Sequence, residues 1–187
     1  MQFPNFTQYI DELQRSLLDI GDCMDQIEAA AEAVIDAISG GNTVFFCGNG
    51  GSAADAQHLA AEMMGRFLRD RNPLPAVALT VDTSVLTAIA NDYSYEDVFS
   101  RQLRGLGKPG DVLVGISTSG NSANVLQCMS VAETMSITTI GLTGRKGNSL
   151  ATKSDVCICV PSDQTNHIQE MHIMVGHFLC GAAEASL

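Results

Sequence analysis

Residues 43–68 read TVFFCGNGGSAADAQHLAAEMMGRFL, and this stretch decides the fold. It opens with the run TVFFC, which is apolar on both faces and is typical of a strand covered on both sides. A glycine-rich turn follows, and residues 52–68 then carry apolar side chains at helical spacing. Strand, turn and helix in this order predict one unit of a parallel sheet, because parallel strands need crossover helices.

The same unit recurs along the rest of the chain. Helical stretches are predicted at about 84–90, 94–106, 122–135, 147–153 and 165–185, and they alternate with the apolar runs PAVALT (75–80), DVLVGIS (111–117), ITTIGLT (137–143) and DVCICVP (155–161). Five buried strands with helices between them predict an α/β fold, a doubly wound five-stranded parallel sheet flanked by helices.

A long helical segment precedes the first strand. Residues 6–38 have apolar side chains at helical spacing, broken softly near Gly21, and Gly40 and Gly41 form a helix stop. This pattern predicts one long helix or a helical pair. The length of 187 residues predicts a single domain, 1–187, in which residues 1–40 pack in an oligomer.

Composition excludes several classes of protein. Hydrophobic residues make up 45% and charged residues 17%, so the chain can form a core. A net charge of −11 disfavours nucleic acid, and the low charged fraction favours an oligomer. The sequence has neither a membrane-spanning run nor an export signal. The spacing of its six cysteines suits reduced thiols in a cytoplasmic protein.

The first turn is a candidate ligand site. Asn49, Gly50, Gly51 and Ser52 lie where the carboxyl end of a predicted strand meets a helix. Glycines allow close backbone approach, and free amides attract anions or polar oxygens. The turn lacks the spacing of a dinucleotide motif and the lysine of a P-loop. A tight turn that needs glycine for its shape alone is the structural alternative.

A second turn follows the third predicted strand. Ser117, Thr118, Ser119 and Ser122 place hydroxyls and backbone amides just before a helix, an arrangement suited to a phosphate monoester. Serine and threonine also cap helices and form turns without binding anything. In a doubly wound sheet this turn would lie beside the first, which favours the functional interpretation.

Polar side chains follow the first turn along its helix. His58 and Glu62 are four residues apart, with Asp55 one turn earlier and Arg66 one turn later, so all four share a helix face. An imidazole and a carboxylate at this spacing can ligate a metal, or the carboxylate can act as a general base. An exposed face with ion pairs is the alternative.

The final helix holds three of the four histidines, His167, His172 and His177, together with Gln169. Single histidines on an apolar helix are usually packed and hydrogen bonded. Gln169 and His177 are eight residues apart, about 12 Å along an ideal helix. Their membership of one metal site would therefore stretch the reach of both side chains.

Four motifs together carry a family resemblance that spans nearly the whole chain: CGNGGSAADAQHLAAE, AIANDY, GISTSGNSANV, and IQEMHI followed by His177. The chain resembles the bacterial phosphoheptose isomerases of the sugar-isomerase (SIS) family. The resemblance implies a SIS domain with a flavodoxin-like sheet. It also implies conversion of sedoheptulose 7-phosphate to D-glycero-D-manno-heptose 7-phosphate, for the heptose of the lipopolysaccharide core.

The resemblance also assigns residues. It implies Glu62 as catalytic base and His177 as catalytic acid, in homotetramers whose active sites are shared between subunits. It implies one zinc ion per subunit, held by His58, Glu62, Gln169 and His177. Besides the two turns, the implied substrate contacts are Arg66, Asn91, Asp92 and Gln169.

One departure and two alternatives accompany this interpretation. His167 precedes the Ile-Gln-Glu run where relatives often carry Arg, which bears on a substrate-phosphate or interface contact there. One alternative is a non-catalytic SIS adaptor that binds the bacterial replication initiator. The resemblance to that adaptor, however, implies other residues at the positions that match Glu62 and His177. The other is an isomerase of another sugar phosphate.

Overall fold

The computed structural model describes residues 5–187, and its centre is one parallel sheet. The strand order is β2-β1-β3-β4-β5, which confirms the predicted doubly wound α/β fold. The strands are β1 (Val44–Gly48), β2 (Ala76–Ala78), β3 (Val112–Ile116), β4 (Thr138–Gly144) and β5 (Val156–Val160).

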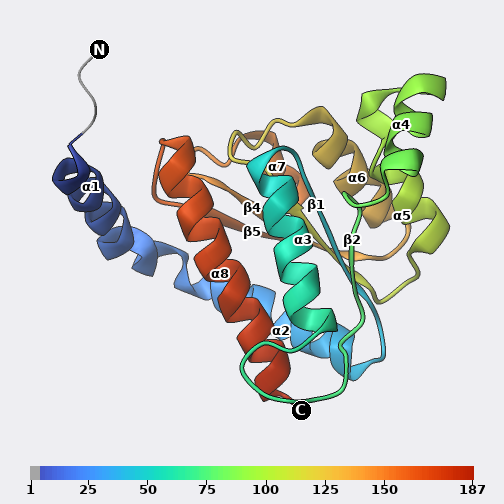
Figure 1. Cartoon of the computed structure of the whole chain (residues 1–187), viewed down its shortest axis with the longest axis horizontal. Coiled ribbons are helices and arrows are strands. Elements are labelled where there is room, and N and C mark those ends of the chain that lie inside the picture. The colour runs from blue at the N-terminus through green and yellow to red at the C-terminus, as the bar shows by residue number, and fades with distance from the viewer. Residues whose placement is uncertain (1–4) are drawn as a thin grey trace.

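Helices cover both faces of the sheet (Figure 1). They are α1 (Phe6–Leu18), α2 (Met24–Ser39), α3 (Gly51–Met64), α4 (Thr83–Asp92), α5 (Ser100–Leu106), α6 (Ala123–Thr134), α7 (Asn148–Lys153) and α8 (Thr165–Ala185), with short 3-10 helices η1 (Asp19–Cys23) and η2 (Tyr95–Asp97). Helices α2, α3 and α8 share one apolar cluster with the sheet, while residues of α4 to α7 belong to a second cluster on its other face.

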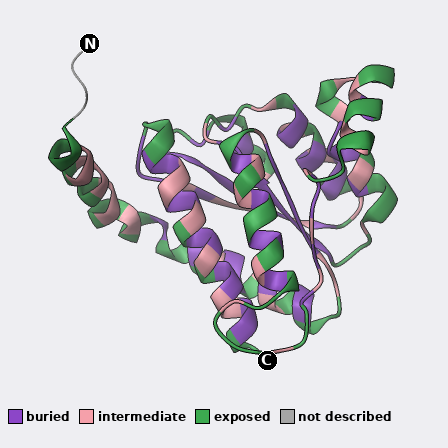
Figure 2. Cartoon of the chain, in the orientation of Figure 1, coloured by how far each residue is buried: buried purple, intermediate pink, exposed green. Residues whose placement is uncertain are grey.

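The strands divide the core between these two faces. Val44 and Phe46 of β1 belong to the cluster under α2, α3 and α8, whereas Phe45 and Cys47 belong to the other. Every residue of β1 is buried, which is why the strand is apolar on both faces (Figure 2). The same alternation fixes α3 on one side of the sheet and α6 on the other.

The N-terminal segment is a helical pair. Gly21 lies within η1, which joins α1 to α2, so the break near Gly21 is confirmed. Helix α1 has no buried residue and projects away from the sheet (Figures 1 and 2). It touches α8 through Tyr9, whose ring lies 4.6 Å from the ring of His167.

Two predicted helices have different bounds. The helix predicted over 52–68 ends at Met64, because the next residue is Gly65 and the following backbone amides donate to Glu184 instead of continuing the helix. The helix predicted over 94–106 is divided into η2 and α5. The hydroxyl of Ser94 accepts a hydrogen bond from the amide of Glu96 and favours a short 3-10 turn there.

No helix within residues 5–187 is both long and apolar enough to cross a membrane. The six cysteines form no disulfide within residues 5–187, and four of them are buried. Burial raises the pKa of Cys180 to about 12 and also that of Cys157 to about 12. These two thiols are therefore protonated and unreactive near neutral pH.

Candidate active site

The two predicted ligand turns meet at the carboxyl edge of the sheet. Strands β1 and β3 are neighbours, and Gly48 at the end of one pairs with Ile116 at the end of the other. The crossover connections diverge between these strands, where doubly wound sheets bind ligands. The structure therefore brings the glycine turn and the serine turn together, as predicted.

Glycine is favoured by backbone conformation at one position in the first turn and allows close side-chain packing at another. Gly50 has a φ of 57°, a conformation that residues with a Cβ atom rarely adopt. A Cβ atom at Gly51 would collide with the carboxamide of Gln169 on α8. The turn therefore allows the start of α8 to lie directly against the start of α3.

Asn49 joins the two turns. Its Nδ2 donates to Oδ1 of Asn124 at 2.8 Å, and Nδ2 of Asn124 donates back to Oδ1 of Asn49 at 2.9 Å. The hydroxyl of Tyr95 also donates to Oδ1 of Asn49, at 3.1 Å. Sequence reasoning did not select Asn124 or Tyr95, although Asn124 lies within the quoted GISTSGNSANV motif. The carboxamide of Asn49 is thus oriented by partners from α6 and η2.

Three hydroxyls converge in the serine turn. Oγ of Ser117 lies 2.9 Å from Oγ of Ser122 and 3.4 Å from Oγ of Ser119. Ser122 precedes α6, and its side chain makes no capping hydrogen bond to that helix. Gly120 has a φ of 66°, which lets the turn close tightly. Convergent hydroxyls beside the start of a helix suit the oxygens of a phosphate group.

A cavity of about 330 Å³ opens beside this turn. Thr118 and Ser119 form part of its lining, and Arg145 and Lys146 contribute positive charge from the loop after β4. Both cations also face Asp163, at 3.8 and 4.0 Å, so the lining is of mixed charge. Sequence reasoning did not select this basic pair.

A second polar cluster lies between α3 and α8. Nε2 of His58 is 2.9 Å from Nε2 of His177 and 3.3 Å from Oε1 of Glu62. The ligand atoms of all three residues lie within 4.8 Å of one another. At such distances one imidazole donates a hydrogen bond to the other, or both lone pairs face one bound cation.

Close helix packing creates this cluster. A Cβ atom at Gly176 would lie 2.6 Å from the methyl groups of Leu59, so glycine is needed where α8 crosses α3. The next residue, His177, is thereby placed against His58. The ring of Phe67 covers the other side of His177, with centroids 5.5 Å apart and planes 27° apart.

Gln169 does not join that cluster within one chain. Its carboxamide lies against Gly51, and His58 follows Gly51 by seven residues. This separation is about 10 Å along a helix axis. Within a single chain, Gln169 is therefore too far from His58 to join the same metal site, as the sequence spacing indicated.

Three other predicted contacts make no hydrogen bond or ion pair to either cluster within residues 5–187. Arg66 is exposed and follows the end of α3, so it does not continue the helical stripe of His58 and Glu62. Asn91 and Asp92 are exposed at the end of α4, where Nδ2 of Asn91 donates to Oδ1 of Asp92 at 2.8 Å.

The remaining histidines, His167 and His172, are buried within the fold. His167 is buried, and its Nδ1 lies 2.8 Å from Oε2 of Glu170. His172 is fully buried, and neither of its ring nitrogens has a hydrogen-bond partner within residues 5–187. Burial lowers its pKa to about 4, although the nearby backbone of Thr143 opposes that shift. It is therefore neutral at physiological pH. These positions match the expectation that single histidines on this helix are packed.

Burial also affects Asp55, one turn before His58. It raises the pKa of the Asp55 carboxyl, although the nearby His58 and His177 oppose that rise. Its Oδ2 atom is buried with no hydrogen-bond partner in the described part of the chain. Asp55 thus interacts electrostatically with His58 and His177 but is not one of the three residues of the cluster.

Comparison with known proteins gives the class and then the family. A SIS domain model matches residues 8–144, so fold and turns define a SIS-domain protein. The phosphoheptose isomerase of Rhodospirillum rubrum is 56% identical over 168 residues, which cover 90% of this chain and 89% of the relative. This chain belongs to the phosphoheptose isomerase family.

Solved structures agree with that assignment. The phosphoheptose isomerase of Neisseria gonorrhoeae superposes with a TM-score of 0.90 at 44% identity, over 96% of this chain and 97% of the other. The enzyme of Francisella tularensis gives a TM-score of 0.92 at 33% identity, over 96% of both chains. The resemblance inferred from the sequence motifs is confirmed.

Proposed function

We propose that this protein is an aldose-ketose isomerase that converts sedoheptulose 7-phosphate to D-glycero-D-manno-heptose 7-phosphate. The observation that carries the proposal is the meeting of Glu62 and His177 beside His58, in a chain whose relatives are named phosphoheptose isomerases. The adaptor alternative is not favoured, because both acid-base residues are present and the relatives are enzymes.

The reaction moves protons without changing the oxidation level of the whole molecule. A base removes the proton from C1 of the ketose while an acid protonates the oxygen on C2, which gives an enediol. The enediol then loses the proton of its C1 hydroxyl and receives a proton at C2, which gives the aldose. Glu62 is the proposed base and His177 the proposed acid, since their functional atoms lie close together on facing helices.

The phosphate is assigned to the serine turn. Ser117, Ser119 and Ser122 bring three hydroxyls together at the sheet edge, and the glycine turn supplies Asn49 and Ser52 beside them. This arrangement holds a phosphate mainly by hydrogen bonds, and the start of α6 adds partial positive charge. Binding there would leave the sugar chain free to extend toward the acid-base groups of a neighbouring subunit.

An isomerase assay tests the proposed reaction. Purified protein should convert sedoheptulose 7-phosphate, and it should convert fructose 6-phosphate far more slowly. Faster turnover of fructose 6-phosphate would assign the site to another sugar phosphate. The absence of turnover with either ketose would contradict the isomerase proposal.

His58, Glu62 and His177 also fit a zinc ion. Two imidazole nitrogens and one carboxylate oxygen within 4.8 Å form a set of three protein ligands that leaves one position open, as in catalytic zinc sites. Magnesium and calcium prefer shells made entirely of oxygen, so they suit this set less well. When bound, a zinc ion would polarise the substrate carbonyl. A side chain fully engaged with zinc is a poorer proton carrier, so Glu62 and His177 would act either as ligands or as acid-base groups, or as each at a different stage.

Sharing of active sites between subunits would explain two long separations within one chain, that of the ligand turns from Glu62 and that of Gln169 from His58. Glu62 follows Gly51 by eleven residues, about 16 Å along α3, so the ligand turns and the acid-base groups of one chain lie near opposite ends of the helix. Gln169 is separated from His58 in the same way. A second subunit could bring a serine turn, and a further ligand from Gln169, to each cluster.

The surface around the cluster supports an oligomer. Met174 and Phe178 are 40% and 50% exposed on α8, and Met64 and Leu68 are 47% and 74% exposed just beyond Glu62. Large exposed apolar side chains on α8 and just after α3 favour an interaction surface there. We propose a cytoplasmic homotetramer in which residues 1–40 pack between subunits, and whose product supplies lipopolysaccharide core synthesis.

Metal analysis and light scattering test these finer proposals separately. Protein purified without chelator should contain about one zinc ion per subunit, in accord with a His and carboxylate ligand set. Thorough chelation should then abolish most activity, and added zinc should restore it. Full activity without metal would leave Glu62 and His177 as direct acid-base groups and make the metal incidental.

The mass in solution provides the second measurement. Light scattering should give four times the chain mass of 19.8 kDa. A monomer with full activity would contradict shared active sites, because Gln169 and the serine turn would then have to act within one chain. Mass and metal content should be measured on the same preparation.

A further inference from the structure

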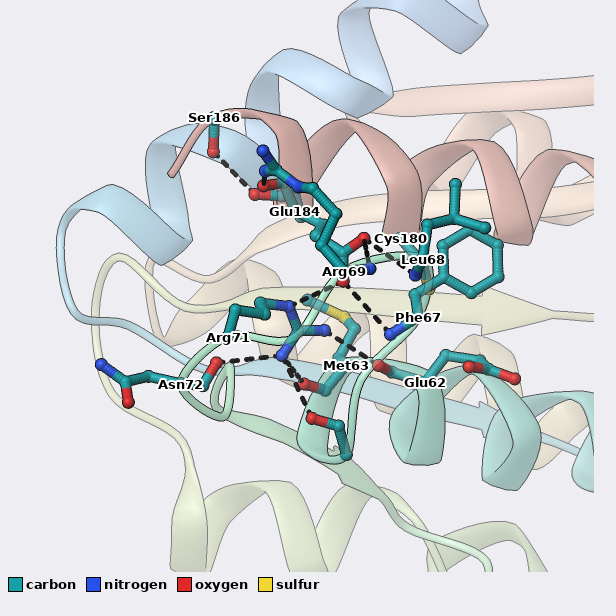
Figure 3. Close-up of polar contacts among 12 residues, drawn as sticks. Glu62, Met63, Phe67, Leu68, Arg69, Arg71, Asn72, Cys180, Glu184 and Ser186 are labelled. Carbon is teal, nitrogen blue, oxygen red and sulfur yellow. Dashed lines mark hydrogen bonds and ion pairs between the residues drawn. The ribbon is translucent and has the colours of Figure 1, made fainter.

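A buried ion pair lies behind the acid-base cluster, where the chain leaves α3 (Figure 3). Nε of Arg71 is 3.0 Å from Oε1 of Glu184, and the two side chains are only 7% and 2% exposed. Arg71 belongs to the segment between α3 and β2, and Glu184 lies near the end of α8. The pair therefore connects the two helices that carry Glu62 and His177.

Glu184 holds the segment that follows α3. Its carboxylate accepts hydrogen bonds from the backbone amides of Phe67, Leu68 and Arg69, at 3.1, 2.9 and 2.9 Å. Burial alone would raise the pKa of Glu184, but these three amides and Arg71 outweigh it and lower that pKa. The carboxylate is consequently charged at neutral pH, and the segment is tied to α8.

Arg71 holds the end of α3. Its guanidinium donates to the carbonyl oxygens of Glu62 at 2.9 Å, Met63 at 2.8 Å and Gly65 at 3.4 Å. The last carbonyls of a helix have no partner within the helix and carry partial negative charge. The planar fork of arginine can reach several of them at once, which the single ammonium group of lysine cannot do.

Each residue of the pair is connected to a proposed proton-transfer residue, Arg71 to Glu62 and Glu184 to His177. Arg71 binds the backbone carbonyl of Glu62, and Figure 3 shows the carboxylate of Glu62 pointing away from the guanidinium. Glu184 binds the amide of Phe67, whose ring stacks on His177. The pair is neutral as a whole, so its influence on the cluster is mainly geometric.

Stability alone is a weak reason for such a pair. Removing two charges from water is costly, and apolar residues of similar volume often stabilise a protein equally well or better. An apolar pair, however, could not bind three amides on one side and four carbonyls, including that of Asn72, on the other. The hydrogen-bonding capacity of the pair points to a role in fixing the backbone.

We propose that Arg71 and Glu184 are positioning residues, which hold Glu62 on α3 and His177 on α8 at the separation that proton transfer requires. The inference rests on the proposed function of these two residues. It assigns no direct contact with substrate to the ion pair. A misplacement of about 1 Å can lower a catalytic rate by about a hundredfold, so small movements of α3 against α8 should be measurable.

The test compares Arg71→Lys and Phe67→Leu with Val131→Ala. Arg71→Lys keeps the charge opposite Glu184 but loses the fork that reaches Glu62 and Met63, and Phe67→Leu removes the ring beside His177. Val131 is buried on α6 in the other apolar cluster, so its substitution lowers stability without touching α3 or α8. The measurements are kcat, KM and melting temperature.

Both positioning variants should lower kcat by about tenfold or more. KM should change less than twofold, because neither substitution alters the serine turn that is proposed to bind the phosphate. Val131→Ala should keep its kcat at a comparable loss of melting temperature. Normal kcat in folded Arg71→Lys would overturn the inference, as would a loss of kcat that Val131→Ala matches at equal melting temperature.

Two further outcomes are decisive. If Arg71→Lys does not fold, Phe67→Leu decides, and a normal kcat in that variant would overturn the link between the ion pair and His177. Glu62→Gln is assayed in parallel. Absence of isomerase activity in the unsubstituted protein would refute the proposed function, and a fully active Glu62→Gln would refute the proton-transfer role on which the inference rests. An inactive Glu62→Gln beside an active Arg71→Lys refutes only the positioning role.

Discussion

Glu62→Gln and His177→Gln are each expected to lower kcat by about a hundredfold or more, the range for lost acid-base catalysis. Glutamine is close in size to glutamate but cannot accept a proton from C1. At position 177 it cannot supply a proton near neutral pH. Both side chains are partly accessible in the cluster, so the substitutions should leave the core intact. Steady-state kinetics with sedoheptulose 7-phosphate measures the effect.

A matched substitution separates this loss from a general loss of negative charge. Glu133 is exposed on α6, outside the N-terminal segment proposed to pack between subunits, and Glu133→Gln makes the same chemical change on the other face of the sheet from α3. It should retain full kcat and the melting temperature of the unsubstituted protein. Near-normal turnover in folded Glu62→Gln or His177→Gln would remove the role assigned to that residue.

Ser119→Asp is expected to raise KM by about a hundredfold, because its carboxylate would occupy the place of the substrate phosphate. Two like charges about 4 Å apart repel by about 4 kcal/mol at the effective dielectric constant near a protein surface. Ser119 is exposed, so solvent screening reduces this repulsion. A hundredfold change in KM corresponds to about 2.8 kcal/mol. The kcat value should fall far less than kcat/KM.

Two controls identify the cause. Ser119→Ala removes the hydroxyl without adding charge and should raise KM only several-fold, as expected for one lost hydrogen bond. Ser84 is exposed on α4, and Ser84→Asp adds the same charge at a distant helix. Unchanged KM in Ser119→Asp would move the phosphate site to another part of the molecule.

The fold could be predicted from the sequence because its pattern is local. Each strand is a short run that is apolar on both faces, and glycine or polar turns separate the strands from helices with a period of 3.6 residues. The bound of α3 was the main error. Its apolar spacing continues to Leu68, but a carboxylate on α8, 116 residues away in sequence, takes the amides that a helix would use.

The two ligand turns could also be predicted, since each lies directly after a strand. The carboxyl ends of neighbouring parallel strands meet at one edge, so residues 48–52 and 117–122 had to be close once β1 and β3 were adjacent. Their internal hydrogen bonds could not be predicted. The pairing of Asn49 with Asn124 depends on side-chain directions across 75 residues of chain.

The sequence by itself determined the α/β class, the two turns at the sheet edge, and the placement of His58 and Glu62 on one helix face, because backbone geometry sets these features over a few residues. Only the tertiary structure decided that His177 meets them while Gln169 lies near Gly51. It also decided that Arg71 and Glu184 form a buried pair behind the cluster. Such contacts depend on how α3 and α8 pack over the sheet, and small residues such as Gly51 and Gly176 set that packing.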